Sequence, residues 1–190
     1  TGVRTCALPI YIVTGAQFPY APTETELRAI GDVNIITSGG APFLAQLLNT
    51  PVSNKENVRG LGLFVHDEVG LGAYLSGSFG LRYDDWRGSL PAQSSPDGTF
   101  AAGREFAADG DVIGWRSLAP RAALLFDTCG DGRLVFVGAF SQYVHQLATS
   151  TLSFANPNSL GVRLVPWNDL NADGQFQAGE GGATMSVAGG

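Results

Sequence analysis

The sequence is poor in several residue types, and each shortage excludes a class of protein. Lys55 is the only lysine and the net charge is −6, so no basic surface is expected to neutralise the phosphates of a nucleic acid. No stretch approaches the roughly 18 uninterrupted apolar residues of a transmembrane helix. The two histidines, His66 and His145, lack the spacing of zinc ligands. Nucleic-acid binding, a membrane-spanning helix and a histidine metal centre are therefore not expected.

The first ten residues, TGVRTCALPI, resemble the conceptual translation of a sequencing-library adapter. Set aside as non-native, they remove Cys6 and leave Cys129 alone, so a disulfide between these two cysteines loses its support. The sequence has no initiator methionine and no signal peptide, and we interpret it as a fragment. The missing targeting signal consequently says nothing about the compartment.

The residues that are abundant favour β structure. The chain has 26 Gly, 11 Phe, 5 Tyr and 3 Trp. Aromatic residues are enriched in strands and glycine in turns. The composition therefore predicts an all-β protein with many turns.

The clearest strand pattern is LGAYLSGSFGLRY, residues 71–83. Leu71, Leu75, Phe79 and Leu81 alternate with Ser76, Ser78 and Arg82. Successive strand residues point to opposite faces, so one face is apolar and the other polar. At about 3.3 Å per residue the stretch is longer than the ~9–11 residues that a tilted membrane strand needs. Taken alone, the pattern fits a lipid-facing strand or a half-buried strand of a soluble sandwich.

Three further stretches carry the same alternation. Residues 57–67 place Leu61, Leu63 and Val65 on one face, and a tight turn at 68–70 would join them to the first strand. Residues 118–127 alternate again, and a turn at 129–132 leads to a strand over 134–145, in which Val135 and Val137 weaken the polar face.

The remaining segments give weaker signals. Residues 11–40 predict mostly loop with one or two strands, and a brief helix over Glu24–Ile30 is an option. Residues 42–50 fit a helix or a strand equally well. Residues 84–117 predict a long polar connector, and residues 146–190 predict loop with one short strand at 160–165.

The connections alternate between tight turns and long loops. This asymmetry is typical of outer-membrane barrels, in which periplasmic turns are short and extracellular loops long. Arg82 and Arg121 would then face the lumen. Tyr83, Trp86 and Tyr143 near the long loops, and Phe126 near a tight turn, fit aromatic girdles, although aromatic residues at strand ends also pack under loops.

Several motifs in order resemble one family. They are LGLFVHDEV, FGLRYDDWRGSLP, WRSLAPRAALLFD, GDGR, AFSQYVHQL and PWNDLNADGQFQAGE. Together they are similar to the C-terminal barrel of TonB-dependent outer-membrane receptors, of the type that carries an N-terminal carboxypeptidase-regulatory-like domain. The resemblance covers about residues 42–180. It implies an antiparallel barrel of about 22 strands with a plugged lumen, of which four to six strands lie here. The plug and the TonB box are not in this sequence.

Residues 169–180 match the calcium-loop pattern D-x-[DN]-x-[DN]-G-x5-E at every specified position. Calcium would take oxygens from Asp169, Asn171 and Asp173, the carbonyl of Gln175, and Glu180, with Gln177 directly or through water. Pro166 before the loop and Gly181-Gly182 after it exclude flanking helices. The alternative is a solvated turn that binds no ion tightly.

No catalytic constellation stands out, so we do not expect an enzyme. His66-Asp67-Glu68 is explained by a strand end, and Asp84-Asp85 begins a loop without a partner. Gly130-Asp131-Gly132 is a turn signal without the Gly-Lys-Ser/Thr of a phosphate loop.

The sequence thus predicts a non-native segment at 1–10, a partial antiparallel up-and-down transmembrane β-barrel at 11–167 and an extracellular loop at 168–190. The expected function is active uptake of a scarce ligand, such as a siderophore or carbohydrate, across the bacterial outer membrane. Expected partners are membrane lipid, TonB through the missing plug, and the ligand. The alternative is a secreted calcium-dependent β-sandwich that binds a carbohydrate or a cell surface. A secreted hydrolase is a weaker third reading.

Overall fold

The computed structural model describes residues 10–189, and its regular secondary structure is almost entirely antiparallel β-strand. About 59% of the residues lie in strands and 4% in helix, which confirms the predicted all-β class. The elements are β1 (Ile10–Gln17), β2 (Tyr20–Leu27), η1 (Ile30–Asp32), β3 (Val33–Ser38), β4 (Ala41–Leu48), β5 (Val52–Gly70), β6 (Leu75–Leu90), β7 (Gln93–Ser95), β8 (Arg104–Phe106), β9 (Asp109–Asp127), β10 (Val135–Ser141), α1 (Thr149–Ser153), β11 (Val162–Pro166) and β12 (Ser186–Ala188). The expectation of a non-native segment at 1–10 falls almost wholly outside the described residues.

The chain divides into two compact units, which share the long strands β5, β6 and β9. Unit 1 contains Thr1–Tyr20, Val58–Arg87 and Gly114–Leu147. Unit 2 contains Ala21–Asn57, Gly88–Ile113 and Ala148–Gly190.

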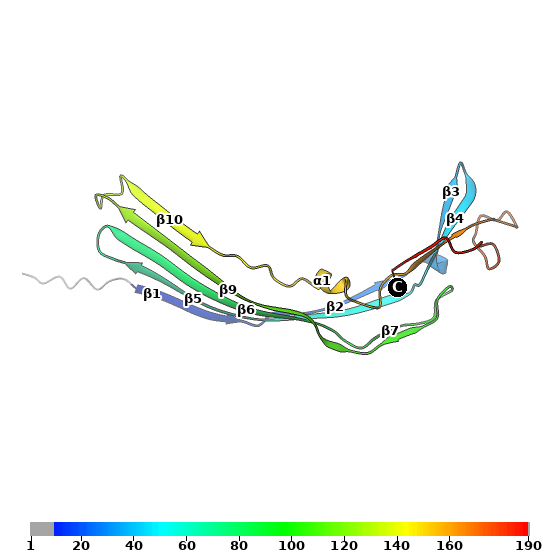
Figure 1. The fold of residues 1–190 in the computed structure, drawn as a ribbon, viewed down its shortest axis with the longest axis horizontal. Helices are drawn as coiled ribbons and strands as arrows, with labels where there is room; N and C mark the ends of the chain where they lie inside the picture. Colours follow the sequence, from blue (N-terminus) through cyan, green and yellow to red (C-terminus); the bar gives the residue numbers. More distant parts are fainter. Residues whose placement is uncertain (1–9, 190) are drawn as a thin grey trace, which may run out of the picture. The chain divides into compact units, whose positions relative to one another are not determined.

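Unit 1 is built on an open antiparallel sheet with the strand order β1-β5-β6-β9-β10 (Figure 1). β1 pairs with the second half of β5, with Val13 opposite His66 and Gln17 opposite Gly62. β10 pairs with the second half of β9, with Phe136 opposite Phe126 and Phe140 opposite Ala122. Residues directly opposite in such a pair share a face, so the register fixes which side chains meet.

One face of the unit 1 sheet is apolar and exposed. Its large side chains alternate along each strand as the sequence predicts, and 42–62% of each remains accessible. The residues of this apolar face are Ile12, Leu63, Val65, Phe79, Leu81, Leu118, Leu124, Phe126, Phe136 and Phe140. Scattered apolar residues are ordinary on a protein surface, but a contiguous set over five strands marks a contact surface.

The prediction for residues 71–90 needs two corrections. The tight turn lies at 71–74 rather than 68–70, because Glu68 and Val69 still pair with β1. The polar connector does not begin at Asp84, since β6 continues to Leu90 and β9 already starts at Asp109. The polar residues after Tyr83 predicted a loop because nothing in the sequence indicated that Asp84 would pair with Arg82 on the same strand.

The N-terminal prediction was also wrong. The segment predicted as mostly loop with one or two strands, residues 11–40, instead contains the three strands β1, β2 and β3, and no helix covers Glu24–Ile30. β2 instead pairs with β5, which supplies the hydrogen-bonding edge that local helix propensity could not foresee. Residues 42–50, which fitted either structure, are strand up to Leu48.

Unit 2 contains a second antiparallel sheet with the order β12-β11-β4-β3. Its small core consists of Ala45 and Leu47 from β4, Val165 from β11, and Trp167, which directly follows β11. Phe100 and Phe176 pack against this core and meet edge to face, with ring centroids 5.7 Å apart. The predicted strand at 160–165 is confirmed as β11.

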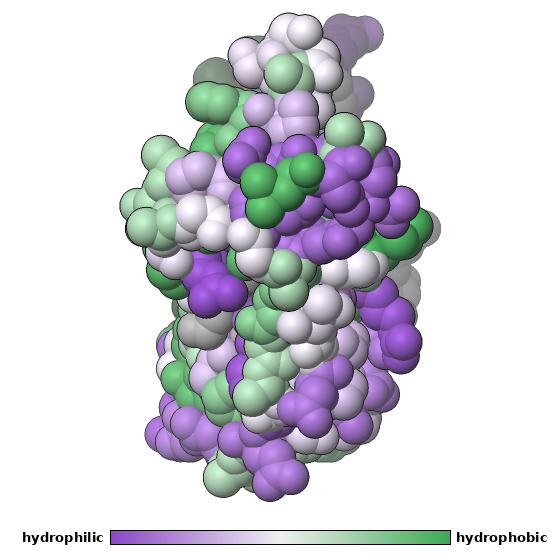
Figure 2. Space-filling model, turned by 90° about the vertical axis from the view of Figure 1, so that its right-hand side faces the viewer, coloured by the Kyte–Doolittle hydropathy of each residue, from purple (hydrophilic) through white to green (hydrophobic). Residues whose placement is uncertain are grey.

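Figure 2 shows a face on which hydrophilic residues predominate, with hydrophobic atoms in small groups between them. Among the described residues, no helix has the length and apolar character needed to cross a membrane.

Candidate functional site

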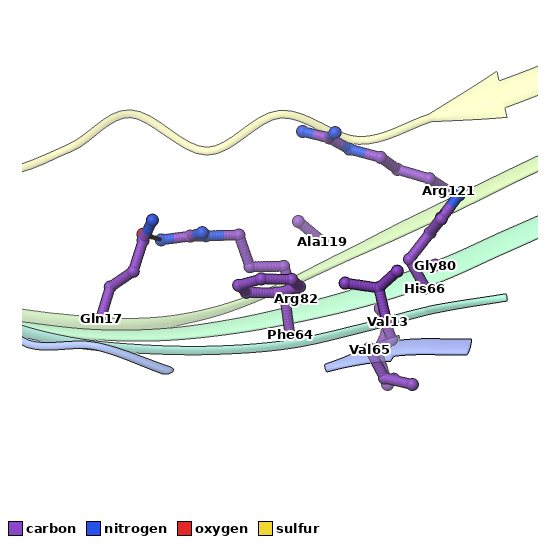
Figure 3. A pocket seen from close by; sticks show the side chains of 10 residues that line it. Val13, Gln17, Phe64, Val65, His66, Gly80, Arg82, Ala119 and Arg121 are labelled. Atoms are coloured by element: carbon purple, nitrogen blue, oxygen red, sulfur yellow. Dashed lines mark hydrogen bonds between the residues drawn. The ribbon is translucent and has the colours of Figure 1, made fainter. Parts of the chain in front are cut away.

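The polar face of the unit 1 sheet carries a hollow of about 480 Å³, shown in Figure 3. We call it the polar hollow, and its lining residues are Val13, Gln17, Phe64, Val65, His66, Gly80, Leu81, Arg82, Ala119 and Arg121. They come from β1, β5, β6 and β9, so pairing of four strands assembles a site that no single motif contains. A neighbouring hollow shares Gln17, Arg82, Ala119 and Arg121 and continues to residues 142–146.

Arg82 is fixed by its neighbours. Its Nε donates to both carboxylate oxygens of Asp84, at 2.8 and 3.0 Å, and Nη2 donates to Asp84 Oδ1 at 2.7 Å. Nη2 also donates to Gln17 Oε1 at 2.9 Å, the bond drawn in Figure 3. Asp84 is buried, and a buried carboxylate needs such a partner.

Gly62 makes room for this ion pair. A Cβ placed on Gly62 would lie 2.6 Å from Arg82 Nη2 and 3.0 Å from Asp84 Oδ1. Gly15 does the same for an aromatic ring, because its Cβ would lie 2.5 Å from Phe64. Glycine opposite a large side chain is therefore what lets the polar face hold Arg82 and Phe64.

Arg121 is held differently from Arg82. Its guanidinium carbon lies 5.0 Å from the centre of the Tyr143 ring, which is a cation–π contact. Among the residues that the structure describes, no carboxylate pairs with it. Figure 3 shows the side chain extending from β9 over the hollow. Two arginines thus line the polar hollow, and Asp84, which lines the neighbouring hollow, neutralises one of them, so the polar hollow carries a net positive charge in an acidic chain.

The acidic and histidine residues named in the sequence analysis do not come together in one site. Asp84 and Asp85 lie on opposite faces, and Asp85 accepts from Arg87 at 2.9 Å and from Arg116 at 3.1 Å. His66 Nε2 lies 3.4 Å from Glu68 Oε1. His145 Nδ1 lies 2.7 Å from the carbonyl of Gln146.

The acidic loop 169–180 is ordered by its own side chains. Asp169 accepts the backbone N–H of Gly174 at 2.8 Å and of Asp173 at 3.2 Å. Asn171 Oδ1 accepts the N–H of Asp173, and Asp173 Oδ1 accepts that of Gln175. Gly174, at φ 73°, supplies the left-handed turn. The structure therefore brings together Asp169, Asn171, Asp173 and the backbone of Gln175.

Glu180, the last predicted calcium ligand, is engaged elsewhere. It is buried, and its carboxylate accepts the indole N–H of Trp167 at 3.3 Å and the backbone N–H groups of Leu170 and Gln177 at 3.1 and 2.9 Å. Within residues 10–189, no group of three or more His, Cys, Asp or Glu side chains is placed to hold a metal ion. The first part of the loop has the donors that calcium prefers, whereas the twelfth position serves the protein core. Calcium binding stays a prediction.

Unit 2 contains a buried polar network that no sequence pattern predicted. Gln93 Nε2 donates to Asn156 Oδ1 at 2.9 Å, and Ser95 Oγ donates to Asn158 Oδ1 at 2.8 Å. Ser153 Oγ donates to Glu56 at 3.1 Å. These bonds pin the segment that follows α1 to β5 and β7, and Asn158 is completely buried. Asn156 and Asn158 lie in the part of the segment 146–190 that the sequence predicted only as loop.

Asp32 forms a second anchor in unit 2. Its Oδ1 accepts the hydroxyl of Thr50 at 2.6 Å, and its Oδ2 accepts the backbone N–H of Thr99 at 2.7 Å. These bonds, the Thr50 hydroxyl foremost, lower the pKa of the Asp32 carboxyl because they favour its charged form. Asp32 thereby ties η1 to the strand connections around it.

No protein-family model matches this chain, and no curated protein or solved structure matches it.

Proposed function

We propose that this chain forms part of the barrel wall of a TonB-dependent receptor in a bacterial outer membrane. The barrel would take up a scarce ligand, with TonB acting on a plug that is not part of this sequence. The observation that carries the proposal is the exposed apolar face of unit 1. A sheet that is apolar on one face and polar on the other is the wall that a transmembrane barrel needs.

The pattern of connections supports the same proposal. The turns at 71–74 and 128–134 are short and belong to unit 1. The connections 28–51 and 91–108, and the segment after β10, belong largely to unit 2 and carry additional strands. In barrels of the outer membrane the short turns lie on the periplasmic side and the long loops outside. Unit 2 would then be extracellular.

The open edges of the unit 1 sheet also support a larger assembly. β1 and β10 are the edge strands, and the whole length of β10 is exposed. Unpaired strand edges are costly in lipid, so further strands would have to pair with both edges. A barrel of about 22 strands would supply them.

Membrane fractionation of cells that express the full-length protein, of which we interpret this chain as a fragment, tests this proposal. We expect the protein in the outer-membrane fraction, released by detergent and not by high salt or alkaline carbonate. Recovery of the folded protein in the soluble fraction without detergent would contradict the proposal. That result would instead favour the secreted β-sandwich, in which a second sheet would cover the apolar face.

A further inference from the structure

The polar hollow of unit 1 contains a positive charge, that of Arg121, which no carboxylate among the described residues neutralises. Asp84 neutralises Arg82 through three short contacts, while the Arg121 guanidinium lies over the ring of Tyr143 and has no carboxylate partner among the described residues. A guanidinium presents five N–H donors in a planar fork that matches a carboxylate or phosphate. Arg121 therefore offers donors over a hollow large enough for a small molecule.

The walls beside Arg121 are mainly apolar. Val13 from β1, Phe64 from β5 and Ala119 from β9 line the hollow, and Figure 3 shows the Phe64 ring on the same side of the sheet as both arginines. Ligand sites combine an apolar lining with a few placed polar groups. Here the polar groups are Arg121, the fixed Arg82, Gln17 and His66.

We propose that the polar hollow binds a small organic anion, whose acidic group pairs with Arg121 and whose apolar part lies against Phe64 and Val13. Arg82 positions the site rather than binding the anion, because Asp84 and Gln17 already occupy the donors on its Nε and Nη2. This inference goes beyond the proposed transporter and concerns the opposite face of the sheet. It would hold for a soluble protein as well.

The charge of the remainder of the chain makes such a site selective. The protein has a net charge of −6, so anions are repelled from most of its surface. A locally positive hollow is then the place where an anion gains most from binding. Because the site is open to solvent, the attraction should weaken as salt is added.

Benzoate and benzamide form a matched pair of probes, since they share shape and size and differ in charge. We would titrate each into the full chain in neutral detergent and Tris-chloride buffer, free of phosphate and other carboxylates, and follow binding by calorimetry. We expect saturable binding of benzoate that is about tenfold tighter than that of benzamide, as one charge-assisted bond predicts. Equal binding of the two probes, or no binding of benzoate, would overturn the proposal.

Benzoate binding by two arginine variants shows whether the anion binds in the polar hollow. Arg121→Gln removes the charge from an exposed side chain, so the fold should survive, as circular dichroism would show. It should weaken benzoate binding about tenfold and leave benzamide unchanged. Arg59→Gln removes the same charge from the other face of β5 and should change neither. If Arg121→Gln binds benzoate like the parent, the anion does not bind in the polar hollow. Loss of membrane partition with benzoate binding intact would count against the transporter alone.

Discussion

Gly62 leaves the space on the polar face that the Arg82–Asp84 ion pair occupies. A valine there would meet Arg82 and Asp84, whose ion pair is partly buried and cannot simply swing away. We expect Gly62→Val to destabilise the chain by about 1–3 kcal/mol, the usual cost of overpacking. Gly138→Val is the control, because a Cβ at Gly138 meets nothing within 4 Å. Denaturant unfolding in detergent measures both, and an equal effect of the two changes would contradict the account of Gly62.

Asp32 gives a prediction for the pH dependence of stability. Its pKa is lowered in the folded state, so its contribution is complete above its unfolded value of 3.8 and declines as pH falls below it. Asp32→Asn is a suitable comparison because asparagine tolerates the positive φ of 53° at this position. We expect the parent to be more stable near pH 6, by about 1 kcal/mol, since hydrogen bonds to charged groups are worth this much when partly exposed.

Unfolding curves between pH 3 and pH 7 would test this expectation. The difference between parent and Asp32→Asn should shrink as pH falls below 3.8. A difference that stays constant over the whole range would show that the charge of Asp32 has no part in it.

The acidic loop 169–180 should bind calcium weakly. Glu180 is a poor residue with which to test it, because its carboxylate holds three N–H donors and its loss would destabilise unit 2 with or without calcium. Asp173 is exposed and better suited. Extracellular calcium modules bind with dissociation constants of about 10⁻⁴–10⁻³ M, so millimolar calcium should raise the melting temperature by a few degrees relative to EDTA.

Asp173→Asn should remove this calcium-dependent shift, because it takes one charge from the three residues that lie together. Asp131→Asn, in the turn between β9 and β10, should leave it unchanged. Differential scanning calorimetry of the three proteins would decide. If the parent shows no shift, or if Asp173→Asn keeps it, the loop is a turn ordered only by its own hydrogen bonds.

The elements differ in how far the sequence could predict them. The alternation of Phe136, Gly138 and Phe140 predicted the apolar face of β10, since period 2 is a local property of the chain. The helix that was an option at 24–30 does not form, because β2 is set by pairing with β5, a contact distant in sequence. The polar hollow was not predicted for the same reason: Gln17, Arg82 and Arg121 come together only through the order of the strands. The spacing Gly60-x-Gly62 was the only sequence feature that indicated this arrangement, because small residues on one strand leave room for large side chains on the neighbouring strand.

The two faces of the unit 1 sheet differ in what can cover them. The apolar face could be read from the sequence, but the period alone did not say whether lipid or a second sheet covers it. In the structure that face remains exposed along β1, β5, β6, β9 and β10, which leaves its partner to be identified by experiment.

Paired substitutions on β9 should identify what covers the apolar face. Leu124 lies on that face, and the adjacent Ala123 lies on the opposite one, across from Ala139. An arginine on the lipid face of a barrel costs about 2–4 kcal/mol near the bilayer midplane, whereas a lumenal arginine is solvated. We therefore expect Leu124→Arg to reduce insertion of the parent protein into lipid vesicles strongly and Ala123→Arg to reduce it little. Vesicle flotation with protease protection measures both. If both variants insert like the parent, or if the parent folds fully without lipid or detergent, the apolar face does not meet the membrane.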